Sequence, residues 1–529
     1  MKTFKIFVLI NCACINILLG QIGPTQNELK EASFNYSDWL LPNHDYSGQR
    51  YVELNEITKR NIKNLRVASI YQAGDLGVFE TNPIVYQGVM YITTTLSTIA
   101  LDAVTSKPIW RHEWQSKAKK MWPMHRGAAL KDGILVRGTS DGYLFALDSK
   151  TGETIWERPA ANSEIGEMFT MSPLIFENMI LIGPAGSEEG VRGWIGAFDL
   201  KTGKPIWKFY TIPGEGDAGS ETWGNSKSRL HGGGAIWTQL SIDKDAGTLY
   251  VPVGNPAPDW YDEDRPGDNL YTCSMLALNV RTGEYKWHYQ VTPHDMHDYD
   301  LTQVSPLFST AVKGKKRNLI TVVGKEGLLN VLDRDSKEHM YQVPVTKQKN
   351  VKDPITVEGT YACPGVHGGV EWNGPAYNAA TNMLYVNAVE WCATLKKAKT
   401  DPTKEGNYWG GTFEPDSFEV SKGWLTAIDA STGNINWQYE ADKPLLAAIT
   451  TTSNGLLFTG EMTGDFIVLD AENGDVLYRF NTGGPVIGGI VTYRVNQKEY
   501  IAVMSGATSG YFAGLPGSAT VIVFEMPNR

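Results

Sequence analysis

One pattern of hydrophobic and polar positions recurs along the chain. An apolar triplet leads to Asp or Asn, a short polar stretch that commonly contains Thr-Gly follows, and an aromatic residue comes a few positions later. Seven segments follow this pattern: IALDAVTSKPIW (99–110), FALDSKTGETIW (145–156), GAFDLKTGKPIW (196–207), LALNVRTGEYKW (276–287), NVLDRDSKEHMY (330–341), TAIDASTGNINW (426–437) and IVLDAENGDVLY (467–478). Glycine adopts a positive φ without steric cost. Each segment therefore predicts two strands joined by a tight turn, with the aromatic residue ending the second strand.

The spacing of these segments predicts units of four strands. The intervals from Asp102 to Asp148 and from Asp429 to Asp470 each fit four short strands, and the longer intervals leave room for insertions. A unit of this kind cannot bury its apolar face alone, so the units must stack on one another. Four strands per unit at this period predict an all-β fold, an eight-bladed β-propeller of four-stranded antiparallel blades.

The eighth blade is expected to combine both ends of the chain. The strand-like segments YIAVMSG and ATVIVFEM near the C-terminus carry no repeat, and a strand near 65–71 would complete their blade. We therefore expect the propeller to extend over 65–529. The preceding segment, 21–64, is expected to cross the ring before the chain enters it.

Composition and charge exclude several classes of protein. The 529 residues include 48 Lys and Arg against 58 Asp and Glu, a net charge of −10. This balance argues against a nucleic-acid partner, which selects a basic surface. Charged residues make up 20% and hydrophobic residues 42% of the chain, so it is not disordered.

The N-terminus resembles a secretory signal. Lys2 and Lys5 precede an apolar run over 6–19, which is too short to span a membrane as a helix. We expect a signal peptide over 1–20, no transmembrane segment after its cleavage, and a periplasmic or secreted protein. The alternative is a buried N-terminal strand.

Three cysteines remain after that cleavage. Cys363 and Cys392 both border strand-like segments and could pair in an oxidising compartment, while Cys273 lies within a strand-like run and is most simply a buried thiol. The chain contains no CxxCH segment, so no covalently attached c-type haem is expected.

Two stretches concentrate oxygen-bearing side chains beside predicted loops. VGNPAPDWYDEDRPGDN (253–269) contains Asn255, and QVTPHDMHDYD (290–300) contains Asp295, Asp298 and Asp300. Carboxylate and amide oxygens suit a hard cation. His294 and His297 leave zinc as an alternative, although no tetrahedral Cys/His set accompanies them. A solvated acidic loop is the other alternative.

The repeat with its closing Trp, together with GNPAP and HDMHDYD, resembles the quinoprotein alcohol dehydrogenases. These enzymes carry pyrroloquinoline quinone (PQQ) and a metal ion on an eight-bladed propeller with tryptophan-docking repeats. The resemblance implies metal ligation by Glu188 (of GSEEGVRG), Asn255 and Asp298, with Glu189 as the alternative to Glu188. It implies that Asp298 is the general base. It also matches Cys363 and Cys392 to a structural disulfide.

The metal can be calcium or a lanthanide. Asp300 stands two residues after Asp298. An aspartate at this place resembles the lanthanide-dependent members of the family, and we expect Asp300 to be a further ligand. The extra negative charge favours a trivalent ion because Coulomb attraction scales with the product of the charges.

The resemblance also implies the residues that contact the quinone. Trp237 of HGGGAIW would form the floor of the site, while Arg126 and Lys325 would meet carboxylate or quinone oxygens. Further contacts are expected from four loop residues: Glu80, Thr170, Gly186 and Ser187.

The chain departs from the family in three places. Lys120 and Met121 stand where two adjacent cysteines usually lie over the quinone, so the ceiling must be different, and Met121, Trp122 and His125 are the candidates for it. Glu371 aligns with a family asparagine, with Asn373 close by. The segments KPLLAAI and SGYFAGL replace expected tryptophans in the last blades.

The resemblance implies a dehydrogenase that oxidises a primary alcohol, polyol or sugar by hydride transfer to PQQ. Electrons would leave through a separate c-type cytochrome or another acceptor. One alternative is a noncatalytic propeller, a scaffold or partner-binding protein of the outer-membrane assembly type. Another is a sensor that binds the quinone without turnover.

Overall fold

A computed structural model describes residues 23–118, 122–400 and 408–527. The expected signal peptide lies outside these residues, as do Lys120 and Met121. In the described part of the chain, no helix is both long enough and apolar enough to cross a membrane.

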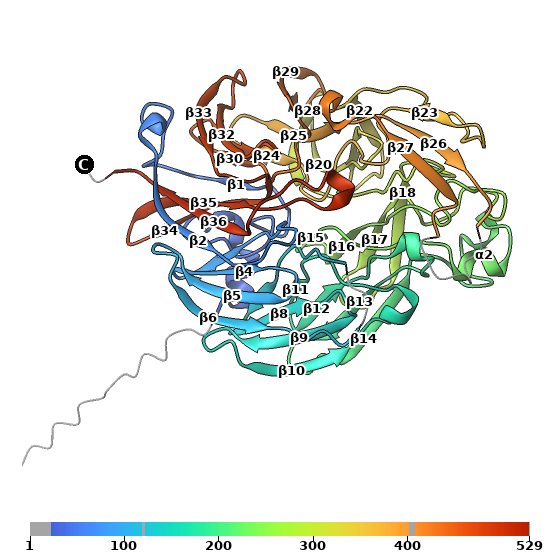
Figure 1. The fold of residues 1–529 in the computed structure, drawn as a ribbon, viewed down its shortest axis with the longest axis horizontal. Helices are drawn as coiled ribbons and strands as arrows, with labels where there is room; N and C mark the ends of the chain where they lie inside the picture. Colours follow the sequence, from blue (N-terminus) through green and yellow to red (C-terminus); the bar gives the residue numbers. More distant parts are fainter. Residues whose placement is uncertain (1–22, 119–121, 401–407, 528–529) are drawn as a thin grey trace, which may run out of the picture.

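Eight antiparallel sheets of propeller type follow one another around a ring in chain order (Figure 1). The first four blades consist of β3 (Ile84–Tyr86), β4 (Val89–Thr93), β5 (Ser97–Asp102) and β6 (Pro108–Glu113); β7 (Ala129–Lys131), β8 (Ile134–Gly138), β9 (Tyr143–Asp148) and β10 (Thr154–Pro159); β11 (Leu174–Phe176), β12 (Met179–Ile182), β13 (Trp194–Asp199) and β14 (Pro205–Tyr210); and β15 (Ser241–Asp243), β16 (Thr248–Pro252), β17 (Ser274–Asn279) and β18 (Tyr285–Gln290).

The next three blades consist of β19 (Leu307–Val312), β20 (Lys315–Val322), β21 (Leu328–Asp333) and β22 (His339–Pro344); β24 (Ala376–Asn378), β25 (Met383–Glu390), β28 (Lys422–Asp429) and β29 (Ile435–Ala441); and β30 (Thr450–Thr452), β31 (Leu456–Gly460), β32 (Asp465–Asp470) and β33 (Val476–Asn481). The all-β propeller expected from the repeats is confirmed.

The eighth blade joins the two ends of the propeller chain. Its strands β34 (Val486–Val495), β35 (Lys498–Ser505) and β36 (Thr520–Glu525) are completed by β2 (Arg66–Gln72), which pairs antiparallel with β36. The strands at the rim, such as β2 and β6, alternate between exposed and half-buried residues, whereas inner strands such as β3 are buried throughout. A single chain therefore closes the ring through backbone hydrogen bonds between its two ends.

The repeated aromatic residue docks onto the turn of the next blade. The indole nitrogen of Trp110 on β6 donates to Ser149 O (3.0 Å), and its ring lies where a Cβ on Gly152 would fall, 2.6 Å away. Trp156 meets Leu200 O and Gly203 in the same way. Gly152 has φ +74°, so glycine is needed there for its backbone as well as for its size. The expectation that the aromatic ends its strand was wrong, because Trp110 and Trp156 are the third residues of six-residue strands that continue along the rim.

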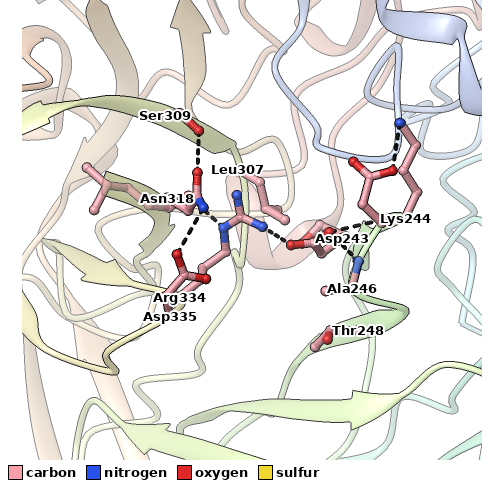
Figure 2. Close-up of polar contacts among 12 residues, drawn as sticks. Asp243, Lys244, Ala246, Thr248, Leu307, Ser309, Asn318, Arg334 and Asp335 are labelled. Carbon is pink, nitrogen blue, oxygen red and sulfur yellow. Dashed lines mark hydrogen bonds and ion pairs between the residues drawn. The ribbon is translucent and has the colours of Figure 1, made fainter. Parts of the chain in front are cut away.

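Polar contacts lie both between the fourth and fifth blades and within the fifth blade. Figure 2 shows Arg334, which follows β21, ion-paired with Asp243 at the end of β15. Asn318 on β20 donates to Asp335 (2.9 Å) and accepts from Ser309 (2.7 Å). The Arg334–Asp243 ion pair joins the fifth blade to the fourth, whereas the contacts of Asn318 lie within the fifth blade.

The segment that precedes the propeller touches several blades. It contains the short helix α1 (Gln26–Lys30) and β1 (Tyr51–Val52), which pairs in parallel with β30. Tyr46 donates through its hydroxyl to Ile175 O (2.6 Å), and Gln49 donates to Leu307 O (2.7 Å). These contacts reach the third, fifth and seventh blades, which lie in different parts of the ring.

A small sheet inserted near the sixth blade carries the disulfide. β23 (Thr360–Ala362), β26 (Ala393–Lys397) and β27 (Gly411–Pro415) form this three-stranded sheet. The Cys363–Cys392 disulfide is present beside it, and Cys273 is a buried free thiol. The second helix, α2 (Ser226–Leu230), lies in the connection between β14 and β15.

Candidate active site

The loops between the blades enclose a cavity of about 310 Å³. This volume is at the lower end of the range for small-molecule sites. Most of the residues predicted from the sequence line it: Glu80, Arg126, Thr170, Gly186, Ser187, Glu188, Trp237, Asp298, Asp300 and Lys325. Segments far apart in the sequence thus contribute to one site.

Lys325 joins the two aspartates of the HDYD segment. Its Nζ lies 3.0 Å from Asp298 Oδ2 and 2.8 Å from Asp300 Oδ2, and all three side chains are buried. Burial lowers the pKa of Lys325, but the charges of Asp298 and Asp300 outweigh this effect and raise it well above its ordinary value. The lysine is therefore a fixed cation between the two carboxylates.

The two carboxylate oxygens of Asp298 differ in their contacts. Its Oδ2 contacts Lys325 and accepts from the Tyr511 hydroxyl at 3.4 Å, whereas its buried Oδ1 has no hydrogen-bond partner. Burial raises the pKa of Asp298 well above its usual value, while Lys325 opposes the rise. The residue adopts φ +62°, a strained conformation of the kind that clusters at functional sites.

Asn255 places a second buried oxygen without a partner beside these acids. Its backbone amide donates to Asp300 Oδ1 (2.8 Å), and its side-chain amide donates to Pro256 O, which leaves Oδ1 free. Gly254 makes this approach possible, because a Cβ there would lie 2.5 Å from Asp300 Oδ1. Both oxygens of Asp300 are therefore engaged by the protein.

Three carboxylates meet at one point: Glu188, Asp259 and Asp298 each offer an oxygen, and these oxygens lie within 4.8 Å of one another. Burial, and then the charge of Asp300, raises the pKa of Glu188 to about 7. Asp300 lies outside this group although it was expected to be a ligand, and Asp259 lies inside it although no role was assigned to it from the sequence. Its position four residues after Asn255 in GNPAPD was the available signal.

Glu189 and the acids and histidines of the loop around residue 295 do not join this group. The side chain of Glu189 packs against Gly166 instead. Asp295 accepts hydrogen bonds from His297 N (3.1 Å) and Tyr299 N (2.9 Å), and His294 faces Gly267 O and Asp262. Among the described residues, no histidine or cysteine lies in the carboxylate group, so the donor set is not one for zinc.

Arg126 occupies the other end of the cavity. It forms a buried ion pair with Glu80 (2.8 Å) and donates to Thr170 Oγ1 (3.2 Å). Its guanidinium carbon lies 4.9 Å from the ring centre of Trp237 and 5.2 Å from that of Trp372. Burial raises the pKa of Glu80, and the charge of Arg126 opposes this rise.

Aromatic and apolar side chains form the remaining walls: Trp122, Pro123, Met124, Trp372, Trp409, Tyr511 and Phe512. Of the residues expected to form the ceiling, Trp122 lines the cavity. His125 does not; it is buried against Thr93 and Gly127. Tyr511 and Phe512 belong to SGYFAGL, so this segment supplies aromatic walls even without tryptophan.

Glu371 lines the cavity where the family asparagine was expected. Burial raises its pKa to about 8, and its Oε1 has no hydrogen-bond partner. Asn373 instead donates to Leu446 O (2.8 Å) and Ile487 O (3.0 Å), so it holds loops of the last blades together. The departure from the family thus brings an acid, not an amide, to the site.

Comparisons with known proteins agree with this architecture. Residues 39–349 match the family described as glucose/ethanol/alcohol dehydrogenase, beta-propeller domain. Residues 421–509 match the model described as outer membrane protein assembly factor BamB, a stretch that lies within the propeller repeats.

Full-length relatives extend the match over nearly the whole chain. The dehydrogenase subunit of the quinone alcohol dehydrogenase of Acetobacter aceti is 32% identical, over 92% of this chain and 73% of its own length. The dehydrogenase XoxF of Paracoccus denitrificans is 29% identical, over 96% of this chain and 93% of its own. A solved structure of a europium-containing methanol dehydrogenase has a TM-score of 0.87 and 26% identity, covering 94% of this chain and all of that one. With this propeller topology, a family match over residues 39–349 and a relative 32% identical over 92% of the chain, the chain belongs to the PQQ-dependent quinoprotein alcohol dehydrogenases.

Proposed function

We propose that this protein oxidises a primary alcohol, polyol or sugar by hydride transfer to PQQ, with one metal ion beside the quinone. One observation supports this proposal above the others. Two buried oxygens, Asp298 Oδ1 and Asn255 Oδ1, have no hydrogen-bond partner, and they occur together with a cavity that has aromatic walls and two cationic side chains. A noncatalytic scaffold needs neither feature.

The cavity suits a flat aromatic anion. Trp237 and Trp372 offer ring faces, and Arg126 and Lys325 offer positive charge for carboxylate or quinone oxygens. Glu80, Thr170, Gly186 and Ser187 line the same space and are proposed as further contacts. The described residues therefore fit PQQ.

The donor set suits a hard cation. Glu188, Asn255 and Asp298 are proposed as ligands, because carboxylate and amide oxygens are the donors that calcium and lanthanide ions prefer. Asp300 is proposed to add to the negative charge around the ion, and Lys325 keeps it oriented toward Asp298. The similarity to a europium-containing enzyme supports a light lanthanide over calcium.

The chain's own residues can move the proton of the substrate. When bound, the quinone would supply the hydride acceptor and the metal ion would supply Lewis-acid chemistry beside it. Asp298 Oδ1 accepts the hydroxyl proton of the alcohol as general base, while Lys325 holds Oδ2 and so fixes the direction of the carboxylate. Trp122, Trp409 and Phe512 exclude water from the reacting carbon.

We infer that the protein lies in the periplasm or outside the cell and passes electrons to a separate c-type cytochrome or another acceptor. The Cys363–Cys392 disulfide supports an oxidising compartment. A separate carrier is proposed because the sequence has no CxxCH segment for a haem.

Reconstitution tests the function. Purified protein is loaded with PQQ and either calcium or a light lanthanide, its absorption is recorded, and dye-linked oxidation is measured over a panel of alcohols, polyols and aldoses. We expect one quinone per chain and turnover with at least one class. Absence of quinone binding at micromolar concentration would contradict the proposal and favour a scaffold.

A further inference from the structure

Asp259 is a fully buried acid whose carboxylate has no hydrogen-bond partner. Its side chain is 0% exposed, and neither Oδ1 nor Oδ2 meets a donor. One of these oxygens lies within 4.8 Å of carboxylate oxygens of both Glu188 and Asp298. A buried carboxylate without a donor or a counter-ion is costly, so the position calls for a cation.

The surrounding loop holds Asp259 in this place by its backbone. Arg265 is also fully buried, and its guanidinium donates to Asp259 O (2.9 Å), Pro258 O (2.9 Å) and Asp295 O (2.7 Å). The arginine thus ties the loop of Asp259 to the loop of Asp298. Its hydrogen bonds go to backbone carbonyls and to Asn269, and leave the Asp259 carboxylate free.

Asp295 shows what a structural acid looks like in the same region. It is equally buried, yet its two oxygens accept backbone amides of His297 and Tyr299. Asp259 has no such bonds and turns toward two other carboxylates. A role in holding the loop therefore does not account for its side chain.

From this geometry we propose that Asp259 is a further ligand of the metal ion, additional to Glu188, Asn255 and Asp298, and that it strengthens the preference for a trivalent ion. The inference rests on the proposed function, because it assigns a residue to the metal site of that function. With Asp259, the site has three carboxylate ligands whose oxygens converge on one point, and Asp300 lies outside this group.

The charge balance explains the preference. Glu188, Asp259, Asp298 and Asp300 carry four negative charges when ionised, and Lys325 is the cation in ion-pair contact with them among the described residues. The remaining charge of about −3 is neutralised by a trivalent ion and only in part by calcium. Because the attraction scales with the product of the charges, loss of Asp259 weakens lanthanide binding more than calcium binding.

Europium luminescence tests the ligand directly. The wild type, Asp259→Ala and Asp259→Asn are reconstituted with PQQ and Eu³⁺, and excited-state lifetimes in H₂O and D₂O count the water molecules bound to the ion. We expect about one more water in Asp259→Ala. The dissociation constant for Eu³⁺ should rise about tenfold or more, since loss of a mere outer-shell partner already costs 10- to 100-fold. In Asp259→Asn, which keeps the shape of the side chain, Eu³⁺ affinity should fall more than Ca²⁺ affinity.

Controls separate this inference from the proposed function. Asp264→Asn removes an exposed acid of the same loop and should leave both measurements unchanged, and circular dichroism reports whether each variant is folded. Unchanged water number and affinities in both Asp259 variants, with a clear loss in Asp298→Ala, would overturn the role of Asp259 alone. Absence of saturable Eu³⁺ binding by the wild type would overturn the metal site and this inference together.

Discussion

Removal of the Cys363–Cys392 disulfide should lower the stability of the protein by a predictable amount. The two cysteines are 29 positions apart in the sequence. On the chain-entropy model, closing a loop of this length removes about 12 cal/mol/K from the unfolded state, or about 3.6 kcal/mol at 25 °C. Unfolding entropies of about 2.1 cal/mol/K per residue give roughly 1.1 kcal/mol/K for 529 residues, so the expected fall in Tm is about 3 °C.

The effect should extend to the wall of the cavity. Pro364 follows Cys363 and its carbonyl accepts from the Tyr299 hydroxyl (2.6 Å), and His367 stacks on Trp391 with ring centres 4.1 Å apart. His367 also meets Tyr511 O at 2.7 Å. The disulfide therefore anchors a segment that touches both the loop of Asp298 and an aromatic wall.

Calorimetry on the Cys363→Ala/Cys392→Ala variant and on the wild type gives the shift. Wild type treated with a reductant is the matched control, because it loses the bond but keeps both sulfur atoms in place. Both samples should melt about 3 °C lower, with similar far-UV circular dichroism. A shift below 1 °C in both would refute the reasoning, because the bond would then not restrict the unfolded chain.

Four other substitutions probe the site and Glu326, the buried acid next to Lys325. Asp298→Ala should lower turnover by about 10²–10⁴-fold with an unchanged fold, measured by dye-linked kinetics, because the general base is lost; wild-type activity would contradict that role. Arg126→Gln leaves Glu80 buried without its partner and should lower the stability of the protein by roughly 3–5 kcal/mol in thermal melts. The double variant with Glu80→Gln should recover most of this stability. If the double variant is instead less stable than Arg126→Gln, the two residues do not stabilise the protein as a pair. Burial raises the pKa of Glu326 to about 8, so its stability contribution is present below the unfolded pKa near 4.5 and is lost as pH rises through 8. Glu326→Gln should therefore be the more stable form at pH 9 by roughly 3–5 kcal/mol, and the gap should close near pH 5 in melting curves. Asp300→Ala should reduce the activity gained from a lanthanide over calcium; equal activities with both ions in the wild type would argue against a lanthanide site.

The fold was predictable because its physical causes are local and repeated. The segment FALDSKTGETIW, which ends in Trp156, encodes a turn, a glycine and an aromatic within twelve residues, and similar segments recur in other blades. In the structure, most docked aromatics pack on the glycine of the next repeat, as Trp110 packs on Gly152, whereas Trp287 packs against Lys337. A repeat whose members contact one another therefore carries its tertiary contacts in its own sequence.

The walls of the cavity could not be derived in this way. Trp372, Trp409 and Tyr511 come from three separate connections, and nothing in their local sequence distinguishes them from the other aromatic residues of the blades. Trp409 is held from outside the propeller repeat: its carbonyl accepts from Trp260 N (3.0 Å), and the two rings stack at 5.3 Å. Such contacts join loops that are far apart in the sequence, so the local sequence of one loop does not predict them.

Asp259 was visible in the sequence as an acid near Asn255, but its burial could not be predicted. It lies close to Asp262, Glu263 and Asp264, and a cluster of acids of this kind is typical of a solvated loop. Burial separates them: Asp259 is 0% exposed, whereas Glu263 and Asp264 are exposed. The sequence shows the charge of each residue but not its side of the loop, and that side is decided here by the buried guanidinium of Arg265.

The arrangement of charge also explains why this site sits on a closed ring. Carboxylates as close as those of Glu188, Asp259 and Asp298 repel one another when no ion lies between them, and the backbone would relieve that repulsion by moving apart. The three residues belong to different inter-strand connections, each anchored at both ends in strands of the propeller. Because β2 and β36 pair and close the ring, no blade can move outward without breaking contacts with its neighbours. The stability gained from blade packing thus opposes the electrostatic repulsion among the three carboxylates. Because the blades supply this stability, the loops can hold an arrangement that they could not maintain alone.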